Sequence, residues 1–294
     1  MTTNDLLLET YCWVDDEIKR LGLDLRSRGP DPRLTDSEVL TMELVGEGLG
    51  LDRDSALFHF FSQYHVAEFP ALAQLHRTTF ARQAANLWWV AIQLHRRLAQ
   101  HLVERAPFWL LDSVGLPVCQ LTRADHCRCF ADVAHVGREH EKSGYFYGFR
   151  VHLRTSPEGV IAQIGLAPAQ VSDLAMSEEL LPVGDAGVAL GDRNYWSPKR
   201  SQALAQRGWL LQAPFRHVKE DPTPQHSRAL AAIRERIETS IGQLVERFHL
   251  KRTWARDLWH LTHRLIRKVL SHTLAVWFNV RSGIPPLELA TTFQ

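Results

Sequence analysis

The sequence lacks the features of a secreted or membrane-spanning protein. It has only four cysteines in 294 residues, too few for a disulfide framework at this length, which favours a reducing compartment. No uninterrupted apolar stretch approaches the roughly 20 residues that span a bilayer. The first residues, Met1–Asp5, have neither the basic start nor the apolar core of a signal peptide. We therefore expect a cytoplasmic protein with no membrane partner.

The chain also has almost no net charge, +1 at pH 7, but its charges are unevenly distributed. Residues 1–68 hold 14 Asp and Glu against 6 Lys and Arg, whereas residues 228–268 hold 10 Lys and Arg against 4 Asp and Glu. A surface that binds phosphate groups is therefore expected in the C-terminal half. The alternative is that these basic helices only present solvated faces.

The sequence pattern changes from helical to strand-like near residue 105. A capping box at Thr35 and Glu38 begins one of the early helices. Periodicity predicts further helices over 55–61, 79–98, 177–181, 201–207, 228–248 and 258–280. Apolar or alternating runs predict strands over 108–114, 145–153, 160–166, 188–190 and 209–213. We therefore predict an all-helical N-terminal module, residues 1–104, and an α/β domain, residues 105–294, with a mixed sheet flanked by helices.

Three acidic residues are distinguished by their positions in these elements. Asp112 and Asp192 each follow an apolar run and are expected at the ends of neighbouring strands. Glu238 lies at the flank of the apolar stripe of the helix over 228–248, where it can reach the rim of the sheet. Three such carboxylates can hold two divalent ions, Mg²⁺ or Mn²⁺, for phosphodiester chemistry. The alternative for Glu238 is an ion pair with Arg234, one turn earlier.

Short motifs occur in a fixed order around these acids: Leu34–Glu38 (LTDSE), Phe108–Ser113 (FWLLDS), Gly148–His152 (GFRVH), Leu166–Asp173 (LAPAQVSD), Gly191–Tyr195 (GDRNY) and Ile237–Thr239 (IET). The ordered set resembles the DDE transposases of bacterial insertion sequences, in particular the insertion sequence 982 family. Each motif is weak alone, and the order makes the set fairly specific.

The resemblance implies a ribonuclease H-like core with two Mg²⁺ ions held by Asp112, Asp192 and Glu238. It implies cleavage of double-stranded DNA at the terminal inverted repeats of the protein's own element, and joining of the 3′-hydroxyl ends to target DNA. A homodimer on paired DNA ends is expected, in the bacterial cytoplasm and on the nucleoid when DNA is bound. The alternatives are a non-catalytic DNA-binding protein derived from a transposase, and a plain metal-dependent nuclease.

The sequence departs from the family pattern in two places. Asn194 stands where related families place Gly, and Asn tolerates the left-handed conformation of a tight turn. Around Glu238, larger relatives have Tyr-x₂-Arg-x₃-Glu-x₆-Lys, but here Ala231 replaces the Tyr and Val245 the Lys. The DNA contact of that lysine is therefore unassigned, and Lys251 and Arg252 are the candidates to replace it.

Other basic residues are candidates for DNA contact. The alternating segment around Arg150 and His152 has a polar face. This face is either a site of contact with phosphates or simply exposed to solvent. The polar face of the helix over 258–280 fits a solvated face and a DNA-binding face equally well. The full candidate set is Arg82, Arg96, Arg97, Arg150, His152, Arg234, Lys251, Arg252 and Arg256.

Overall fold

The chain folds into two compact units. In the computed structural model, residues 2–22, 31–104, 106–139 and 144–291 are described. One unit, here called the helical unit, comprises Met1–Leu98 and Gln243–Gln294, and the other, the sheet unit, comprises Ala99–Gly242. The sequence-based division at residue 104 differs from this one in the position of the C-terminal helix.

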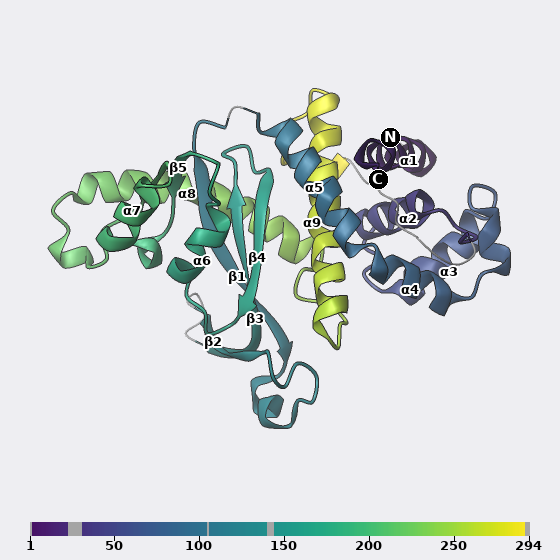
Figure 1. Cartoon of the computed structure of the whole chain (residues 1–294), viewed down its shortest axis with the longest axis horizontal. Coiled ribbons are helices and arrows are strands. Elements are labelled where there is room, and N and C mark those ends of the chain that lie inside the picture. The colour runs from purple at the N-terminus through teal and green to yellow at the C-terminus, as the bar shows by residue number, and fades with distance from the viewer. Residues whose placement is uncertain (1, 23–30, 105, 140–143, 292–294) are drawn as a thin grey trace. The chain divides into compact units, whose positions relative to one another are not determined.

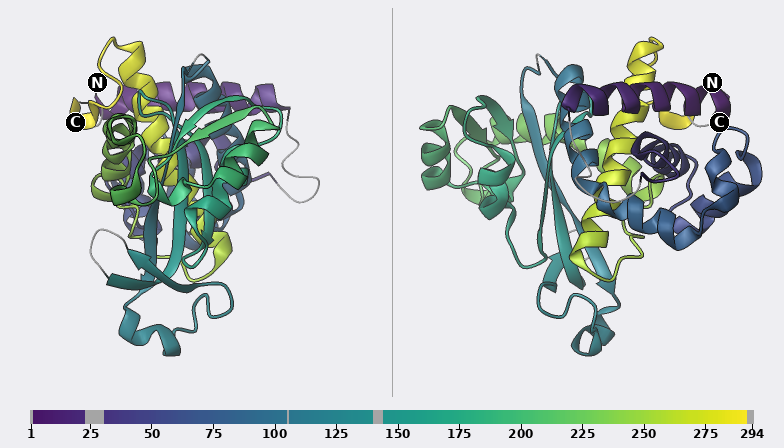
Figure 2. Two further views of the ribbon diagram at one scale, coloured as in Figure 1. Left: turned by 90° about the vertical axis from the view of Figure 1, so that its left-hand side faces the viewer. Right: turned by 45° about the vertical axis from the view of Figure 1, so that its right-hand side comes forward.

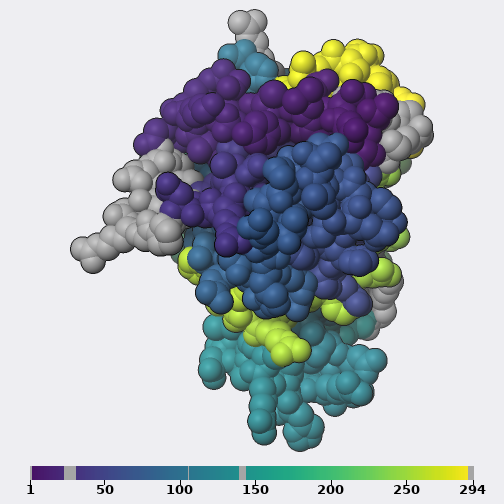
Figure 3. Space-filling model, turned by 90° about the vertical axis from the view of Figure 1, so that its right-hand side faces the viewer, coloured from purple at the N-terminus to yellow at the C-terminus, as the bar shows by residue number. Residues whose placement is uncertain are grey.

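The helical unit is built around the last helix of the chain. Its elements are α1 (Thr3–Leu21), α2 (Asp36–Gly48), α3 (Asp54–Tyr64), α4 (Arg77–Asn86), the first part of α5 (Trp88–Leu102) and α9 (Leu258–Arg281). Figures 1 and 2 show α9 beside α2, and α9 is buried along most of its length. In Figure 3, α1 (dark purple) and residues of α3 and α4 (blue) cover much of the face of this unit that is turned to the viewer. No described helix is long and apolar enough to cross a membrane.

The sequence predicted the start of α2 but not the break between α4 and α5. Thr35 accepts a hydrogen bond from the amide of Glu38, whose side chain accepts one from the Thr35 amide, so the capping box is confirmed. The single helix predicted over 79–98 is two helices separated at Leu87. The Leu87 amide donates to the Ala84 carbonyl three residues earlier, and this tighter turn ends α4.

Beyond its first turn, where His260 is exposed, the polar side of α9 is buried, which corrects both sequence-based alternatives for Arg264, Arg267 and Lys268. Arg264, Arg267 and Lys268 are at most 6% exposed. They form ion pairs with acids of α2 and α3, and His263 contacts Glu43 at 2.8 Å. Burial requires such pairing because an unpaired charge is costly in the interior. The carboxylates of this network are Glu43, Glu47 and Asp54.

This network also accounts for much of the charge imbalance between the acidic N-terminal segment and the basic C-terminal segment of the sequence. The charges that appear separated along the chain meet inside one unit, between α2, α3 and α9. Arg264, Arg267 and Lys268 are therefore not part of a phosphate-binding surface. The basic residues of this segment that are left at the surface include Arg252 and Arg256.

A buried histidine of α9 makes the stability of the helical unit depend on pH. Burial, with a smaller effect of His95, lowers the pKa of His272 from 6.5 to about 3. The unfolded chain therefore binds a proton between those values that the folded unit does not, so stability is full above pH 6.5 and falls below it. At pH 5 the loss should be about 2 kcal/mol, at about 1.4 kcal/mol per pH unit.

Urea unfolding at pH 7.5 and pH 5, compared between the wild type and His272→Gln, measures this effect. The variant should lose less stability on acidification, because its side chain does not titrate. Equal pH dependence in the two proteins would contradict the assignment.

The sheet unit contains one six-stranded sheet. Its strands are β1 (Trp109–Cys119), β2 (His135–Glu139), β3 (Gly144–Thr155), β4 (Ile161–Pro168), β5 (Gly187–Leu190) and β6 (Trp209–Gln212). The order is β2-β3-β1-β5-β6, and β4 also pairs with β3. β1 is antiparallel to β3 and parallel to β5, so the sheet is mixed, as predicted.

Helices cover both faces of this sheet. On one face, Leu110 of β1 and Leu190 of β5 pack against Leu230 and Ile237 of α8 (Pro224–Glu246). On the other face, Leu111 and neighbouring side chains pack near the end of α6 (Asp173–Leu180) and against α7 (Pro198–Ala205). Figure 1 shows α6 on the near side of β1 and α8 on the far side. Successive residues of β1 therefore face different helices.

Two strands differ from the prediction. β1 continues to Cys119 instead of ending at 114, because β3 pairs with it along almost all of its length. β2 was not predicted, and it pairs with the first half of β3, residues 144–148, while β4 pairs with the second half.

Candidate active site in the sheet unit

The pairing of β1 with β5 brings two of the three predicted acids to the same level of the sheet. The parallel register pairs Leu110 with Leu190. Asp112 and Asp192 each lie two residues beyond that pair, so they lie near each other at the carboxyl end of β5. Asp112 itself is inside β1 and not at its end, because β1 continues beyond its short parallel neighbour.

Asp112 lies on the same face of the sheet as Leu110, toward α8. Its Oδ2 accepts a hydrogen bond from Arg234 Nη1 at 2.6 Å, and its Oδ1 accepts one from the Ser113 amide at 2.8 Å. Burial raises the pKa of Asp112 to about 7, and the charges of Asp192 and Asp173 add to this, although Arg234 acts against it. A positive charge at this position would favour the ionised carboxylate.

Glu238 is connected to Asp112 through one guanidinium group. Arg234 donates from Nη1 to Asp112 and from Nη2 to Glu238 Oε1 at 3.0 Å. Glu238 is more than half exposed, whereas Asp112 and Arg234 are each about one-fifth exposed. The ion pair between Arg234 and Glu238 is therefore present, and the same cation brings both carboxylates to one point.

Asp192 is held by the turn that follows it. Its Oδ1 accepts a hydrogen bond from the Asn194 amide at 2.9 Å, and its Oδ2 accepts one from Asn194 Nδ2 at 2.9 Å. Asn194 is part of the short helical turn η3 (Arg193–Tyr195) and is not among the described residues with left-handed backbone, which corrects the sequence-based reason for an Asn here. Asn194 contributes to the site through its side-chain amide.

Gly191 is required by the ring of Tyr195. A Cβ atom at position 191 would lie 2.5 Å from that ring, closer than side chains approach. The Tyr195 hydroxyl is buried, with no hydrogen-bond partner among the described residues. Burial, together with the charges of Asp173, Asp112 and Asp192, raises its pKa well above the ordinary value. The phenol therefore stays protonated near this acidic group.

A fourth acid, Asp173, lies on the other side of β1. It begins α6, and its Oδ1 accepts a hydrogen bond from the Ser113 hydroxyl at 2.5 Å. Asn194 Nδ2 lies 3.5 Å from Asp173 Oδ2, so this amide bridges Asp173 and Asp192. Burial acts to raise the pKa of Asp173, but His152 and Ser113 outweigh it and the pKa is lowered. Asp173 is the last residue of one of the sequence motifs, but the sequence indicated no role for it in the site.

The polar face of β3 is buried rather than exposed to solvent. Arg150, His152 and Arg154 are each at most 8% exposed, because α6 covers this part of the sheet. His152 Nδ1 lies 3.4 Å from Asp173 Oδ1. Arg150 donates to the Ser113 hydroxyl at 3.2 Å. His152 and Arg150 therefore surround Asp173, and the alternative of a solvent-exposed face is wrong for this strand.

The remaining predicted DNA contacts lie outside this site. Arg82 and Arg96 are exposed on α4 and α5, and Arg97 forms an ion pair with Glu17. Lys251, Arg252 and Arg256 lie in the segment between α8 and α9, where Arg252 and Arg256 are exposed.

The donor atoms of the site have the chemistry of a divalent-cation site. Carboxylate oxygens are the ligands that Mg²⁺ and Mn²⁺ prefer. The Arg234 guanidinium is a cation already shared by Asp112 and Glu238. Within the described ranges no three His, Cys, Asp or Glu side chains are close enough to hold one ion. The set therefore fits a cation by charge and donor type, with Arg234 between two of its members.

Comparison with known proteins identifies a family for the chain. A family model described as Transposase DDE domain matches residues 104–258, more than half of the chain. The matched segment contains Asp112, Asp192 and Glu238, and also Asp173. Searches of curated proteins and of solved structures found no match.

Proposed function

Because the chain belongs to the transposase DDE-domain family, we propose that it is a DNA transposase. It cuts double-stranded DNA at the terminal inverted repeats of its own element and joins the 3′-hydroxyl ends to target DNA. The supporting observation is the parallel register of β1 and β5, which brings Asp112 and Asp192 to one level beside Arg234 and Glu238. We also propose that the protein has a ribonuclease H-like core and belongs to the bacterial insertion sequence 982 family.

Asp112, Asp192 and Glu238 are the residues that would hold two Mg²⁺ or Mn²⁺ ions in this proposal. Such ions, when bound, activate the attacking water or hydroxyl and stabilise the leaving oxygen of the phosphodiester. The chain contributes the acids and the groups that orient them. Asn194 fixes both oxygens of Asp192, and the Ser113 amide fixes one oxygen of Asp112.

Arg234 can also contact the DNA in this proposal. Its guanidinium neutralises Asp112 and Glu238 as long as no other cation does. Arginine binds phosphate oxygens by the same two-pronged geometry that it uses for carboxylates. Once released from the acids, Arg234 can bind the phosphate next to the cut.

DNA affinity would come from basic residues outside the acids. Phosphate contacts supply most of the affinity of DNA-binding proteins, without sequence preference. We assign this role to Lys251, Arg252 and Arg256, and assign end recognition to Arg82, Arg96 and Arg97. A homodimer would hold the paired ends.

The DNA around the gene tests the proposed function. Imperfect inverted repeats on both sides of the coding sequence are expected, because a transposase acts on the ends of its own element. A plasmid that carries those flanks should be nicked at the repeats by the purified protein. Binding to the repeats without any nicking would instead support a non-catalytic DNA-binding protein, and nicking without preference for the repeats would support a plain nuclease.

Cleavage should require Mg²⁺ or Mn²⁺. Ca²⁺ should support binding but little cleavage, because it accepts looser and longer coordination. The measurement is nicking of the flanking-repeat plasmid after chelation with EDTA, with each ion then added back. Full cleavage in EDTA would show that the acids do not act through metal ions.

A further inference from the structure

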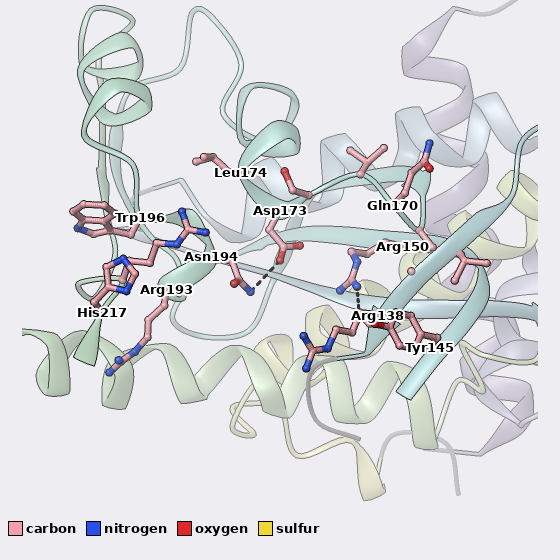
Figure 4. Close-up of a pocket in the computed structure, with 16 residues that line it drawn as sticks. Arg138, Tyr145, Arg150, Gln170, Asp173, Leu174, Arg193, Asn194, Trp196 and His217 are labelled. Carbon is pink, nitrogen blue, oxygen red and sulfur yellow. Dashed lines mark hydrogen bonds between the residues drawn. The ribbon is translucent and has the colours of Figure 1, made fainter. Parts of the chain in front are cut away.

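A cavity of about 690 Å³ opens in the sheet unit beside Asp173 and Asn194. Its walls come from β2, β3, the turn between β4 and α6, η3, and the loop after β6. Figure 4 shows Trp196, His217 and Arg193 on one side of Asp173, and Arg138 and Arg150 on the other. The volume is that of a small-molecule site.

The lining of this cavity is strongly basic. It contains four arginines, Arg138, Arg150, Arg193 and Arg216, and only one carboxylate, Asp173. Asp173 is already engaged by Ser113 and His152. The cavity therefore favours an anionic ligand.

Two of the arginines are available to such a ligand. Arg138 and Arg216 are exposed and form no ion pair with any other described residue. Arg193 also lines the cavity, but its Nη1 atom is buried and does not face it. Arg150, by contrast, is held by the Arg138 carbonyl at 2.6 Å and by Ser113, so it forms the fixed floor. Arg138 and Arg216 are therefore the cations that a ligand in the cavity can reach.

The cavity also offers aromatic faces. Trp196 lines it half-buried, and its ring is fixed against Phe215 at a centroid distance of 4.8 Å. Tyr145 lines the opposite wall and is 62% exposed. Arginines that follow a phosphate backbone, combined with aromatic rings that stack on bases, are typical of sites for unpaired nucleic-acid strands. Bases inside a duplex are already stacked and cannot use such rings.

We propose that this cavity binds an unpaired nucleotide of the DNA strand, with its phosphates on Arg138 and Arg216 and its base against Trp196. The inference rests on the proposed function in that DNA is the substrate. Asn194 connects the two sites, because it lines the cavity and donates to Asp192 Oδ2. A strand held in the cavity would thus reach the acids from the side of Asp173.

Binding of a fluorescent five-nucleotide single strand to the full-length protein, in EDTA, tests the proposal. The double variant Arg138→Ala/Arg216→Ala should bind more weakly. Its slope of log affinity against log salt should fall by about 1.4, at about 0.7 per lost contact of a single strand. Arg123→Ala/Arg128→Ala is the matched control, because both arginines are exposed in the same unit and neither lines the cavity. Equal losses in the two double variants, or no loss in the first, would overturn the proposal.

The position of the base is tested by crosslinking. A 5-iodouracil oligonucleotide should crosslink to Trp196 or Tyr145, and Trp196→Ala should weaken binding about tenfold while Trp196→Phe largely keeps it. Crosslinks only in the helical unit would overturn the proposal. The double variant Arg138→Ala/Arg216→Ala should also lose less affinity for a blunt duplex than for the single strand. Equal losses for the two DNAs would overturn the proposal, since the cavity would then be a general phosphate-binding surface.

The two proposals fail separately. The binding and crosslinking experiments contain no divalent ion and require no catalysis. A protein that crosslinks at Trp196 yet never cuts DNA would keep the cavity assignment and remove the proposed function. A protein that cuts at the repeats and binds the strand equally well without Arg138 and Arg216 would do the opposite.

Discussion

An Asp192→Asn protein should lose strand cleavage in Mg²⁺ by roughly a thousandfold or more while keeping its affinity for DNA within about twofold. The amide keeps the shape of the side chain but removes the charge that would neutralise a metal ion. Metal-assisted catalysis stabilises the transition state by several kcal/mol, and each 1.36 kcal/mol is a factor of ten in rate. Affinity depends mainly on Lys and Arg contacts with phosphates, which this change leaves in place.

Asp125→Asn is the matched control for this experiment. Asp125 is an exposed acid of the same unit, in the short helix η2 (Leu121–His126), and its replacement should change neither cleavage nor binding. Nicking of the flanking-repeat plasmid and binding to the repeat duplex are measured for both variants. If Asp192→Asn nicks at the wild-type rate, the three-acid site is assigned to the wrong residues.

Asp112→Asn should lose cleavage to a similar extent and should keep the ion pair between Arg234 and Glu238. Arg234 donates to Asp112 and to Glu238. The amide at position 112 weakens only one of these contacts, so Arg234 should remain with Glu238. Equal loss of cleavage in both Asp variants would indicate that the acids act together and not through the ion pairs of Arg234.

The sequence predicted the parts of the site that depend on local pattern. Apolar runs predicted β1 and β5, and Asp112 and Asp192 were selected because each follows such a run. The position of Glu238 at the flank of an apolar stripe placed it beside the sheet on α8. These inferences needed only the periodicity of strands and helices.

The parts that were missed depend on contacts between distant segments. Asp173 was placed in a motif without a role, and its contacts with Ser113 and Asn194 depend on the packing of α6 over β1 and β3. β2 is short and is stabilised by pairing with β3. The charged face of α9 resembled a DNA-binding surface because the acids that neutralise it lie some 220 residues earlier in the chain.

Replacing Arg267 by Met should destabilise the helical unit by about 3–5 kcal/mol. Arg267 is 2% exposed and donates to Glu47 at 2.6 Å and to Glu43 at 3.1 Å. Met fills much of the same volume but leaves the buried carboxylates of Glu43 and Glu47, and the partly buried one of Asp54, without the central cation of the network. Removing one member of a buried ionic network costs about this much, because the remaining charge has lost its compensation.

Thermal unfolding measures this loss, with Arg281→Met as the control on the same helix. Arg281 forms an ion pair with Glu9, but both side chains are about half exposed, and such pairs contribute about 1 kcal/mol or less. For a unit of this size, the Arg267 variant should unfold about 10 °C lower and the Arg281 variant within a few degrees of the wild type. Similar shifts in the two variants would mean that the network is compensated by water or by protonation. The close pairing of α2 with α9 would then have to be attributed to apolar packing alone.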